Sequence, residues 1–194
     1  MKYSQLSDIQ YSTDTYSIVP IREADMMAIK QWRNDQMEVL RQSRPLSDED
    51  QLRYYNGPIR ASFEQEQPRI MLFSYLLDHQ LIGYGGLTNI DWENKRAEIS
   101  YLLETGRSKE SNRRQYSDDF SSFLALMKRI AFEELSFNRL FTETFDIRPL
   151  HIEVLENNGF RFEGRMRLHV QIHGQYIDSL IHGCLHEEYD HVQR

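Results

Sequence analysis

The fold is decided by the stretch that begins Arg96-Ala97-Glu98-Ile99-Ser100-Tyr101-Leu102-Leu103 and ends at Leu135. The first eight residues alternate as in a half-buried strand, and a charged segment from Glu104 to Tyr116 follows them. Beyond it, apolar side chains recur at helical spacing, which predicts a long helix with Ser117 as N-cap: Phe120, Phe123, Leu124, Met127, Ala131 and Leu135. A strand followed by a polar loop and a helix N-terminus is a ready-made anion site.

The elements on either side extend this unit. Further strands are predicted at residues 17–22, 69–77, 81–87 and 138–145, and a hairpin around Gly174. Further helices are predicted at residues 25–34, from Ser47 or Asp48 to Tyr55, and at 147–155. Asn56-Gly57-Pro58 is predicted to stop the second of these helices, and Gly159 the third. This order predicts an α+β fold with a mostly antiparallel central sheet flanked by helices and one strand–helix–strand crossover.

Length and composition limit the function classes. The 194 residues predict a single domain over 1–194, in which residues 1–16 form either a loose arm or an extra strand. A net charge of −7 disfavours nucleic acid and anionic membrane as partners. One cysteine, Cys184, excludes an internal disulfide and fits a buried thiol in a reducing cytoplasm. No apolar run is long enough to span a bilayer, so we expect a cytoplasmic monomer or homodimer.

Several short motifs follow one another along the chain. They are Trp32-Arg33-Asn34, residues 97–101 and 131–135, Leu155-Glu156-Asn157-Asn158-Gly159-Phe160, Glu163-Gly164 and Tyr176-Ile177-Asp178-Ser179. Taken together they resemble the GNAT superfamily of N-acetyltransferases, in the branch of ribosomal-protein alanine and amino-sugar N-acetyltransferases. The resemblance implies a GNAT-like fold, acetyl-CoA as co-substrate and transfer of the acetyl group to a primary amine.

Three residues are candidates for catalysis. Acyl transfer to an amine needs a base, and Glu98 matches a glutamate common in this branch; the alternative is a solvated strand residue paired with Lys95 or Arg96. Tyr101 matches a family tyrosine, although core packing with a hydrogen-bonded hydroxyl is the favoured interpretation. His151 stands where many relatives carry a serine near the coenzyme, and is a candidate proton donor or pantetheine contact. The tyrosine that serves as acid in many members falls at Leu155 and is absent.

The coenzyme-binding motif of the family is altered in this chain. By alignment it falls on Arg113-Arg114-Gln115-Tyr116-Ser117-Asp118, with Tyr116 and Asp118 where glycines are usual. Arg148 stands where relatives carry an asparagine that contacts the coenzyme. Either Arg107, Lys109, Arg113 and Arg114 replace the backbone cradle with side-chain ion pairs, or coenzyme binding has decayed and the chain is a non-catalytic binding module.

The acceptor is suggested by a basic connector. Arg33, Arg41 and Arg44 lie near the segment that borders the acceptor side in the resembled fold, and they are compatible with a small-molecule amine such as a nucleotide-linked amino sugar. In the alternative without a binding role, these arginines are solvated or paired with Asp35, Glu38 and Asp48. A protein N-terminus, as in ribosomal-protein acetyltransferases, is the other acceptor considered. Asp178 matches a recurrent aspartate that either orients the substrate or locks a hairpin.

Histidines near the C-terminus invite a metal interpretation. His169 with His173, and His182 with His186, have the spacing of one strand face. No cysteine or carboxylate spacing completes a zinc set, so the sequence predicts no metal site.

Overall fold

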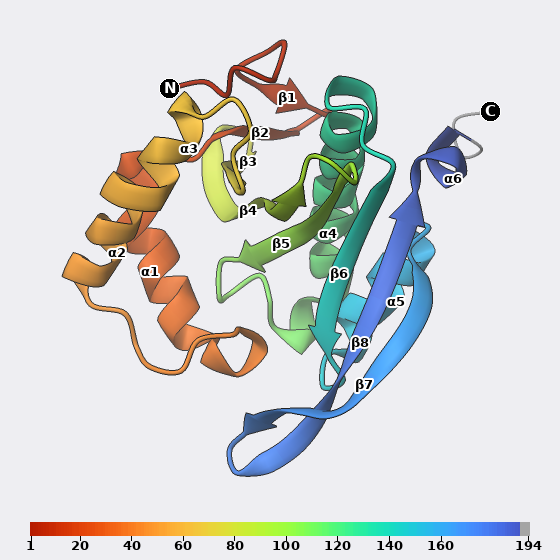
Figure 1. The fold of residues 1–194 in the computed structure, drawn as a ribbon. Helices are drawn as coiled ribbons and strands as arrows, with labels where there is room; N and C mark the ends of the chain where they lie inside the picture. Colours follow the sequence, from red (N-terminus) through yellow and green to blue (C-terminus); the bar gives the residue numbers. More distant parts are fainter. Residues whose placement is uncertain (191–194) are drawn as a thin grey trace.

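The computed structural model describes residues 1–190 and contains one eight-stranded sheet (Figure 1). The strand order is β1-β2-β3-β4-β5-β6-β8-β7, and neighbours pair antiparallel except for β5 with β6, which are parallel. The strands are β1 (Tyr11–Ser12), β2 (Tyr16–Pro20), β3 (Met71–Leu77), β4 (Gln80–Asp91), β5 (Arg96–Leu103), β6 (Arg139–Phe145), β7 (Arg161–Ile172) and β8 (Gln175–Leu185). The predicted α+β fold, with its single crossover from β5 to β6, is confirmed.

Helices cover the sheet as two groups (Figure 1). They are α1 (Met26–Asp35), α2 (Asp48–Tyr54), α3 (Arg60–Glu64), α4 (Arg113–Lys128), α5 (Pro149–Asn157) and α6 (His186–Asp190). Residues Met37–Val39 form a 3-10 turn, η2, after α1. On β5, Tyr101 packs against α4, whereas Leu103 accepts a hydrogen bond from Gln36, at the end of α1. No helix of residues 1–190 has the length and apolarity that a bilayer crossing requires.

The hairpin of β3 and β4 forms where the sequence predicts it. Asp78 and His79 make its two-residue turn with φ of 46° and 67°, the left-handed conformation of tight hairpin turns. On β4, a Cβ atom at Gly85 would lie 2.2 Å from the carbonyl oxygen of Ser100. The close backbone approach expected from the glycines of this strand is therefore present, and it lets β4 and β5 come together beneath α4.

The predicted stop of the second helix at Asn56-Gly57-Pro58 is wrong. A π-helical turn, Tyr55–Ile59, carries α2 directly into α3 with Pro58 inside it. Proline removes one backbone donor, and a widened turn accommodates the ring without ending the helix. Burial of Tyr55 and Ile59 against the core supplies the compensating contact that the local sequence signal does not show.

The start of the long helix also differs from the prediction. Helix α4 begins at Arg113 with Asn112 as N-cap, so Ser117 is inside the helix, where its Oγ donates to the Arg113 carbonyl oxygen at 3.0 Å. Tyr116, expected in the loop, is buried. Its ring joins the apolar stripe one turn before Phe120, and this burial extends the helix toward its N-terminus.

The N-terminal segment packs on the sheet. Tyr3 is 0% exposed, and its hydroxyl accepts a hydrogen bond from the Leu72 backbone N–H at 2.7 Å. Tyr11, in β1, is also buried, and β1 pairs with β2. Of the two alternatives for residues 1–16, these contacts correspond to the extra strand.

Candidate active site

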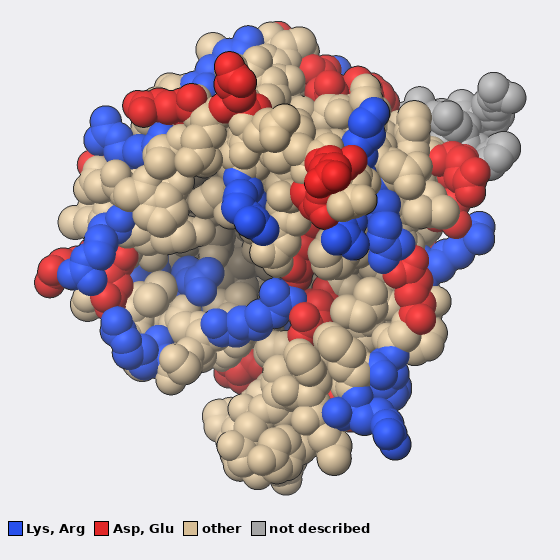
Figure 2. Space-filling view, viewed as in Figure 1, with Lys and Arg blue, Asp and Glu red and all other residues tan. Residues whose placement is uncertain are grey.

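A cleft opens where β5 and β6 separate. The parallel pairing runs from Arg96↔Arg139 to Glu98↔Phe141 and then ends, although β5 continues to Leu103. The cavity in this gap has a volume of about 190 Å³. Seen as in Figure 1, the surface is hollowed between the α1 side and the strands, with basic groups around the hollow and acidic groups at its sheet-side edge (Figure 2). Beyond Glu98, the edge of β5 that faces β6 therefore borders the cleft, while its other edge stays paired with β4.

Unpaired polar atoms gather along the walls of this cleft. The Tyr101 hydroxyl, the Thr142 and Thr144 hydroxyls and Glu143 Oε1 are buried without a hydrogen-bond partner among residues 1–190, and all four residues line the cavity. Buried polar atoms in native proteins almost always have partners. Their concentration in one gap indicates a place that receives a polar ligand or ordered water.

Glu98 lies inside the cleft rather than on a solvated strand face. The residue is 7% exposed, so the interpretation as a solvated residue paired with Lys95 or Arg96 does not describe its surroundings. Its Oε1 accepts from Arg41 Nη2 at 2.7 Å, and its Oε2 accepts from Asn89 Nδ2 at 2.6 Å. Asn89 reaches it from an irregular part of β4, where the register with β5 shifts between Thr88 and Asp91. The carboxylate is thus fixed by two donors at the cleft.

Glu143 is a second carboxylate of the cleft that the sequence analysis did not single out. The same Nη2 atom of Arg41 donates to Glu143 Oε2 at 2.7 Å, and His169 Nε2 lies 3.6 Å from its other oxygen. One arginine therefore bridges carboxylates on β5 and β6. The available signal was the polar run Thr142-Glu143-Thr144 within an otherwise apolar strand that follows the crossover helix.

Tyr101 is packed in the core at the cleft wall. Its ring stacks on Phe120 with centroids 4.4 Å apart, and burial raises the pKa of its phenol well above the ordinary value. The hydroxyl therefore stays protonated at neutral pH. It has both the packing role and an unpaired hydroxyl at the cavity.

His151, Tyr116 and Arg148 lie together beside the cleft. The Tyr116 hydroxyl lies 2.6 Å from His151 Nδ1, and Arg148 Nη2 donates to the same hydroxyl at 3.2 Å. Burial, followed by the charges of Arg148 and His182, holds the pKa of His151 well below its ordinary value. The site therefore holds a neutral imidazole at its wall.

The cations expected to bind the coenzyme divide into two sets. Arg107 makes a two-bond ion pair at 2.8 Å with Asp119, whose side chain is fully buried, so this arginine is engaged in holding the loop. Arg113, at the first position of α4, pairs with the exposed Glu153. Arg114 and Gln115 line a shallow surface hollow beside them. No side chain caps the start of α4, so its first N–H groups and these cations face the same end of the helix.

A second cavity lies on the α1–α2 side of β5. Its lining is mostly apolar and aromatic, and it shares Arg33, Thr88 and Ser100 with the cleft. Arg33 donates to the Tyr84 hydroxyl at 2.5 Å and to Gln42 Oε1 at 3.0 Å. The two cavities thus adjoin at β5, the strand that carries Glu98.

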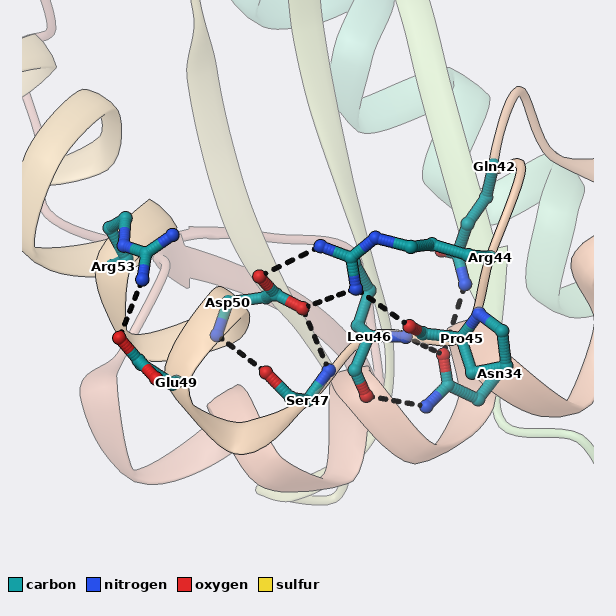
Figure 3. A network of polar contacts seen from close by, with 9 residues as sticks. All are labelled: Asn34, Gln42, Arg44, Pro45, Leu46, Ser47, Glu49, Asp50 and Arg53. Atoms are coloured by element: carbon teal, nitrogen blue, oxygen red, sulfur yellow. Dashed lines mark hydrogen bonds and ion pairs between the residues drawn. The ribbon is translucent and has the colours of Figure 1, made fainter.

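The remaining expected residues lie elsewhere. Arg44 is bound through two nitrogens by Asp50, at 2.7 and 3.0 Å, next to the capping box of α2 (Figure 3). Asp178 accepts from Arg165 and from the Leu168 backbone N–H, both at 2.7 Å, within the β7–β8 hairpin. Among the described residues no group of three or more His, Cys, Asp or Glu side chains gathers as a metal site.

Comparisons with known proteins agree with this architecture. Residues 18–181 match the model of the acetyltransferase (GNAT) domain, so the chain belongs to that family. A spermidine N-acetyltransferase from Vibrio cholerae, solved with CoA and spermine, superposes with a TM-score of 0.78 at 17% identity over 91% of this chain and 99% of its own. The RimL ribosomal L7/L12 α-N-protein acetyltransferase, solved with CoA, gives a TM-score of 0.73 at 16% identity over 92% and 98%. No curated protein sequence matches the chain.

The chain is accordingly an N-acetyltransferase, and acetyl-CoA is its co-substrate. The residues present fit that molecule. The cleft between β5 and β6 offers the unpaired polar atoms that amide groups of an extended arm would bind, and the uncapped start of α4 offers N–H groups for phosphates.

Proposed function

We propose that this chain acetylates the primary amine of a small molecule that approaches β5 from the cavity between the sheet and helices α1 and α2. The observation that carries the proposal is the junction of two cavities at Arg33, Thr88 and Ser100, next to the buried carboxylate of Glu98. A cleft and a cavity that adjoin at one strand allow donor and acceptor to meet at that strand. Proximity of this kind is a major source of rate enhancement.

Glu98 is the proposed base. An amine attacks only in its neutral form, so the ammonium of the acceptor must lose a proton at the site. Glu98 Oε1 and Oε2 are held by Arg41 and Asn89, which keeps the carboxylate oriented at the cleft instead of free to rotate. Acetyl-CoA supplies the activated acetyl thioester. Glu98 takes the proton, and the backbone of β5 beyond it is available to face the reacting carbonyl.

The phosphates of the co-substrate are proposed to lie at the start of α4. Arg113 and Arg114 are at the exposed helix terminus, and the ion pair of Arg113 with Glu153 is a surface pair that an anion can replace. Arg148 is at the start of α5, where it lines the cleft and also a separate cavity that it shares with Ser108 and Tyr116. These side chains take over part of the role that glycine backbone has in relatives.

Two acceptor classes are distinguished by charge. A nucleotide-linked amino sugar would use Arg33, Arg41 and Arg44, and its diphosphate would have to compete with Asp50 for Arg44 and with two glutamates for Arg41. A cationic diamine or polyamine would instead use the carboxylates of Glu98 and Glu143. We favour the cationic amine, because Glu98 and Glu143 line the cleft and share one cation, Arg41, between them, whereas Arg44 does not line the cleft and is paired with Asp50.

A competition assay tests this choice. Acetyl transfer is measured with a polyamine, a nucleotide-linked amino sugar and short peptides that start with Ala or Ser. We expect the polyamine to be acetylated fastest, and Glu143→Gln to raise its Michaelis constant several-fold. Preference for the sugar nucleotide, with a loss of its binding in Arg44→Ala, would refute the cationic acceptor, and acetylation of the peptides alone would refute a small-molecule acceptor.

The role of Glu98 is tested separately. Glu98→Gln keeps the shape of the side chain and removes its basicity, so turnover should fall about a hundredfold. Acetyl-CoA should still raise the melting temperature of this variant as it does for the unaltered chain. Full turnover of the variant between pH 6 and 8 would exclude Glu98 as the base.

A further inference from the structure

A chain of three polar side chains leads from the surface to the cleft. Arg148 precedes α5, His151 is in the first turn of α5, and Tyr116 is in the first turn of α4. Arg148 Nη2 lies 3.2 Å from the Tyr116 hydroxyl, which lies 2.6 Å from His151 Nδ1. Tyr116 is 4% exposed and His151 is 7% exposed, so water does not compete freely for these bonds.

The direction of the hydrogen bonds follows from the chemistry of the groups. A guanidinium can only donate, so the Tyr116 oxygen accepts from Arg148. Within residues 1–190 His151 Nδ1 is the other hydrogen-bond partner of this hydroxyl, so the hydroxyl proton is paired only when Nδ1 accepts it, and we assign that direction to the bond. A neutral imidazole that accepts at Nδ1 carries its proton on Nε2. The arrangement therefore fixes one tautomer of His151.

The surroundings keep His151 neutral in that tautomer. Its ring stacks on Phe120 with centroids 4.2 Å apart, next to the ring of Tyr101. The positive group Arg148 and the second histidine His182 face it as well, and with burial they hold the pKa of His151 well below its ordinary value. Burial, Arg148 and His182 each disfavour the imidazolium.

The remaining nitrogen is free to serve a ligand. His151 lines the cleft, and of its two ring nitrogens Nδ1 is the one for which the structure of residues 1–190 shows a hydrogen bond. His151 is 7% exposed, whereas His182 is 0% exposed. The proton on Nε2 is therefore available at the wall of the cleft.

We propose that His151 donates a hydrogen bond from Nε2 to the sulfur that leaves the acetyl thioester, and that Tyr116 and Arg148 are positioning residues that fix its tautomer. This inference rests on the proposed acetyl transfer. His151 and Leu155 are four residues apart on one face of α5, so the histidine lies one turn from the place of the missing family tyrosine. A neutral imidazole holds its Nε2 proton too tightly to give it up, and it acts as a donor, as neutral histidines do elsewhere.

The step balances without a proton from His151. Glu98 first takes the proton of the ammonium and passes it to water in the open cleft. The C–N bond then forms as the neutral amine attacks, the second nitrogen proton goes to Glu98, and the C–S bond breaks with its electron pair on sulfur. The hydrogen bond from Nε2 stabilises that negative charge, and the thiolate takes a proton from water after release. His151 thus differs in role from the proton donor considered from the sequence.

The tautomer is tested first, on the unaltered chain. Nitrogen-15 NMR of histidine-labelled protein should show His151 protonated on Nε2 only, with no titration between pH 5.5 and 8. The variant His151→Gln identifies its signal. A proton on Nδ1, or an imidazolium at pH 7, would overturn the proposal whether or not an acceptor is known.

Kinetics then test the function of the donor. His151→Phe should lower kcat about 10- to 100-fold, which reaches at most the lower end of the range seen for loss of one transition-state donor. The Michaelis constant for acetyl-CoA should change little. His151→Gln, which keeps an N–H group, should recover part of the loss. Tyr116→Phe should give a smaller loss together with a mixed-tautomer spectrum, which a purely structural role would not produce.

A surface histidine provides the control. His79→Asn, at an exposed turn whose φ of 67° asparagine tolerates, should leave both kcat and the His151 signal unchanged. If His151→Phe folds and retains full kcat, the hydrogen bond to sulfur is excluded. Absence of acetyl transfer by the unaltered chain would instead contradict the proposed function, while the tautomer result would stand.

Discussion

Removal of Arg41 is the most direct test of the two-carboxylate cleft. Its Nη2 atom lies 2.7 Å from an oxygen of Glu98 and 2.7 Å from an oxygen of Glu143. Those two oxygens are therefore at most about 5.4 Å apart, and in Arg41→Ala they face each other without a cation between them. Two unit charges at that distance repel by about 3 kcal/mol for an effective dielectric constant of about 20.

Arg41 is half exposed, with 51% of its side chain accessible, so water entering the vacated space weakens this repulsion. The repulsion that remains disfavours the state in which both carboxylates are ionised. Since Glu98 has to be ionised to accept a proton, the acid limb of the pH profile should move to higher pH.

The measurement is kcat/KM as a function of pH, because this ratio reports the ionisation of the free enzyme. The reaction is monitored through the thiol that it releases. Arg44→Ala removes an arginine whose partner is Asp50, so it should leave the midpoint of the acid limb unchanged. Glu143→Gln added to Arg41→Ala should move the limb back, since the like charge is gone. An unmoved midpoint in Arg41→Ala would refute the coupling of these groups.

Three further predictions concern the coenzyme end, stability and the thiol. Arg113→Ala with Arg114→Ala should weaken acetyl-CoA binding by about 1.5–3 kcal/mol per lost charged hydrogen bond, and unchanged affinity in titration calorimetry would contradict their role. Asp119→Ala leaves Arg107 without its buried partner and should lower the unfolding free energy by about 3 kcal/mol in urea. Burial raises the pKa of Cys184 to about 11, so iodoacetamide should react with it only after denaturation; rapid labelling of the native protein would contradict this.

Much of the fold was accessible from local sequence signals. The eight residues predicted as a strand form β5, although six of them are buried and the strand is not half-buried as the alternation predicted; the turns at Asp78-His79 and around Gly174 coincide with the observed hairpins. These elements are specified by period and turn chemistry over short distances, which a single sequence reports directly. The ordered motifs then selected one family, and the match over residues 18–181 confirms it.

The errors occurred where tertiary burial overrides a local signal. Pro58 reads as a helix stop, but the helix passes through it because Tyr55 and Ile59 are buried on the core. Tyr116 was predicted to be part of a polar loop, but it is in α4 and its ring is on the buried face of that helix. In both cases an aromatic or aliphatic contact with a distant part of the chain decides the conformation, and the neighbouring residues do not reveal it.

Partners of the charged side chains were the least predictable part of the site. Arg41 was expected to be free or paired with neighbours such as Asp35 and Glu38, but it bridges Glu98 and Glu143. The second of these glutamates is 102 residues away in sequence, so no spacing rule connects it to the arginine. The proposed roles of Glu98, His151 and the arginines remain predictions for the experiments above.

Tyr116 connects the altered coenzyme motif with the histidine at the cleft. By alignment it stands where relatives carry a glycine, and a side chain at this position removes the close backbone approach that a phosphate would use. In this chain the ring turns inward, lengthens α4 at its start and places a hydroxyl 2.6 Å from His151 Nδ1. We infer that Tyr116 leaves phosphate binding to Arg113 and Arg114 and gives His151 the partner that fixes its tautomer. Tyr116→Gly should therefore disturb the histidine signal more than it improves coenzyme affinity.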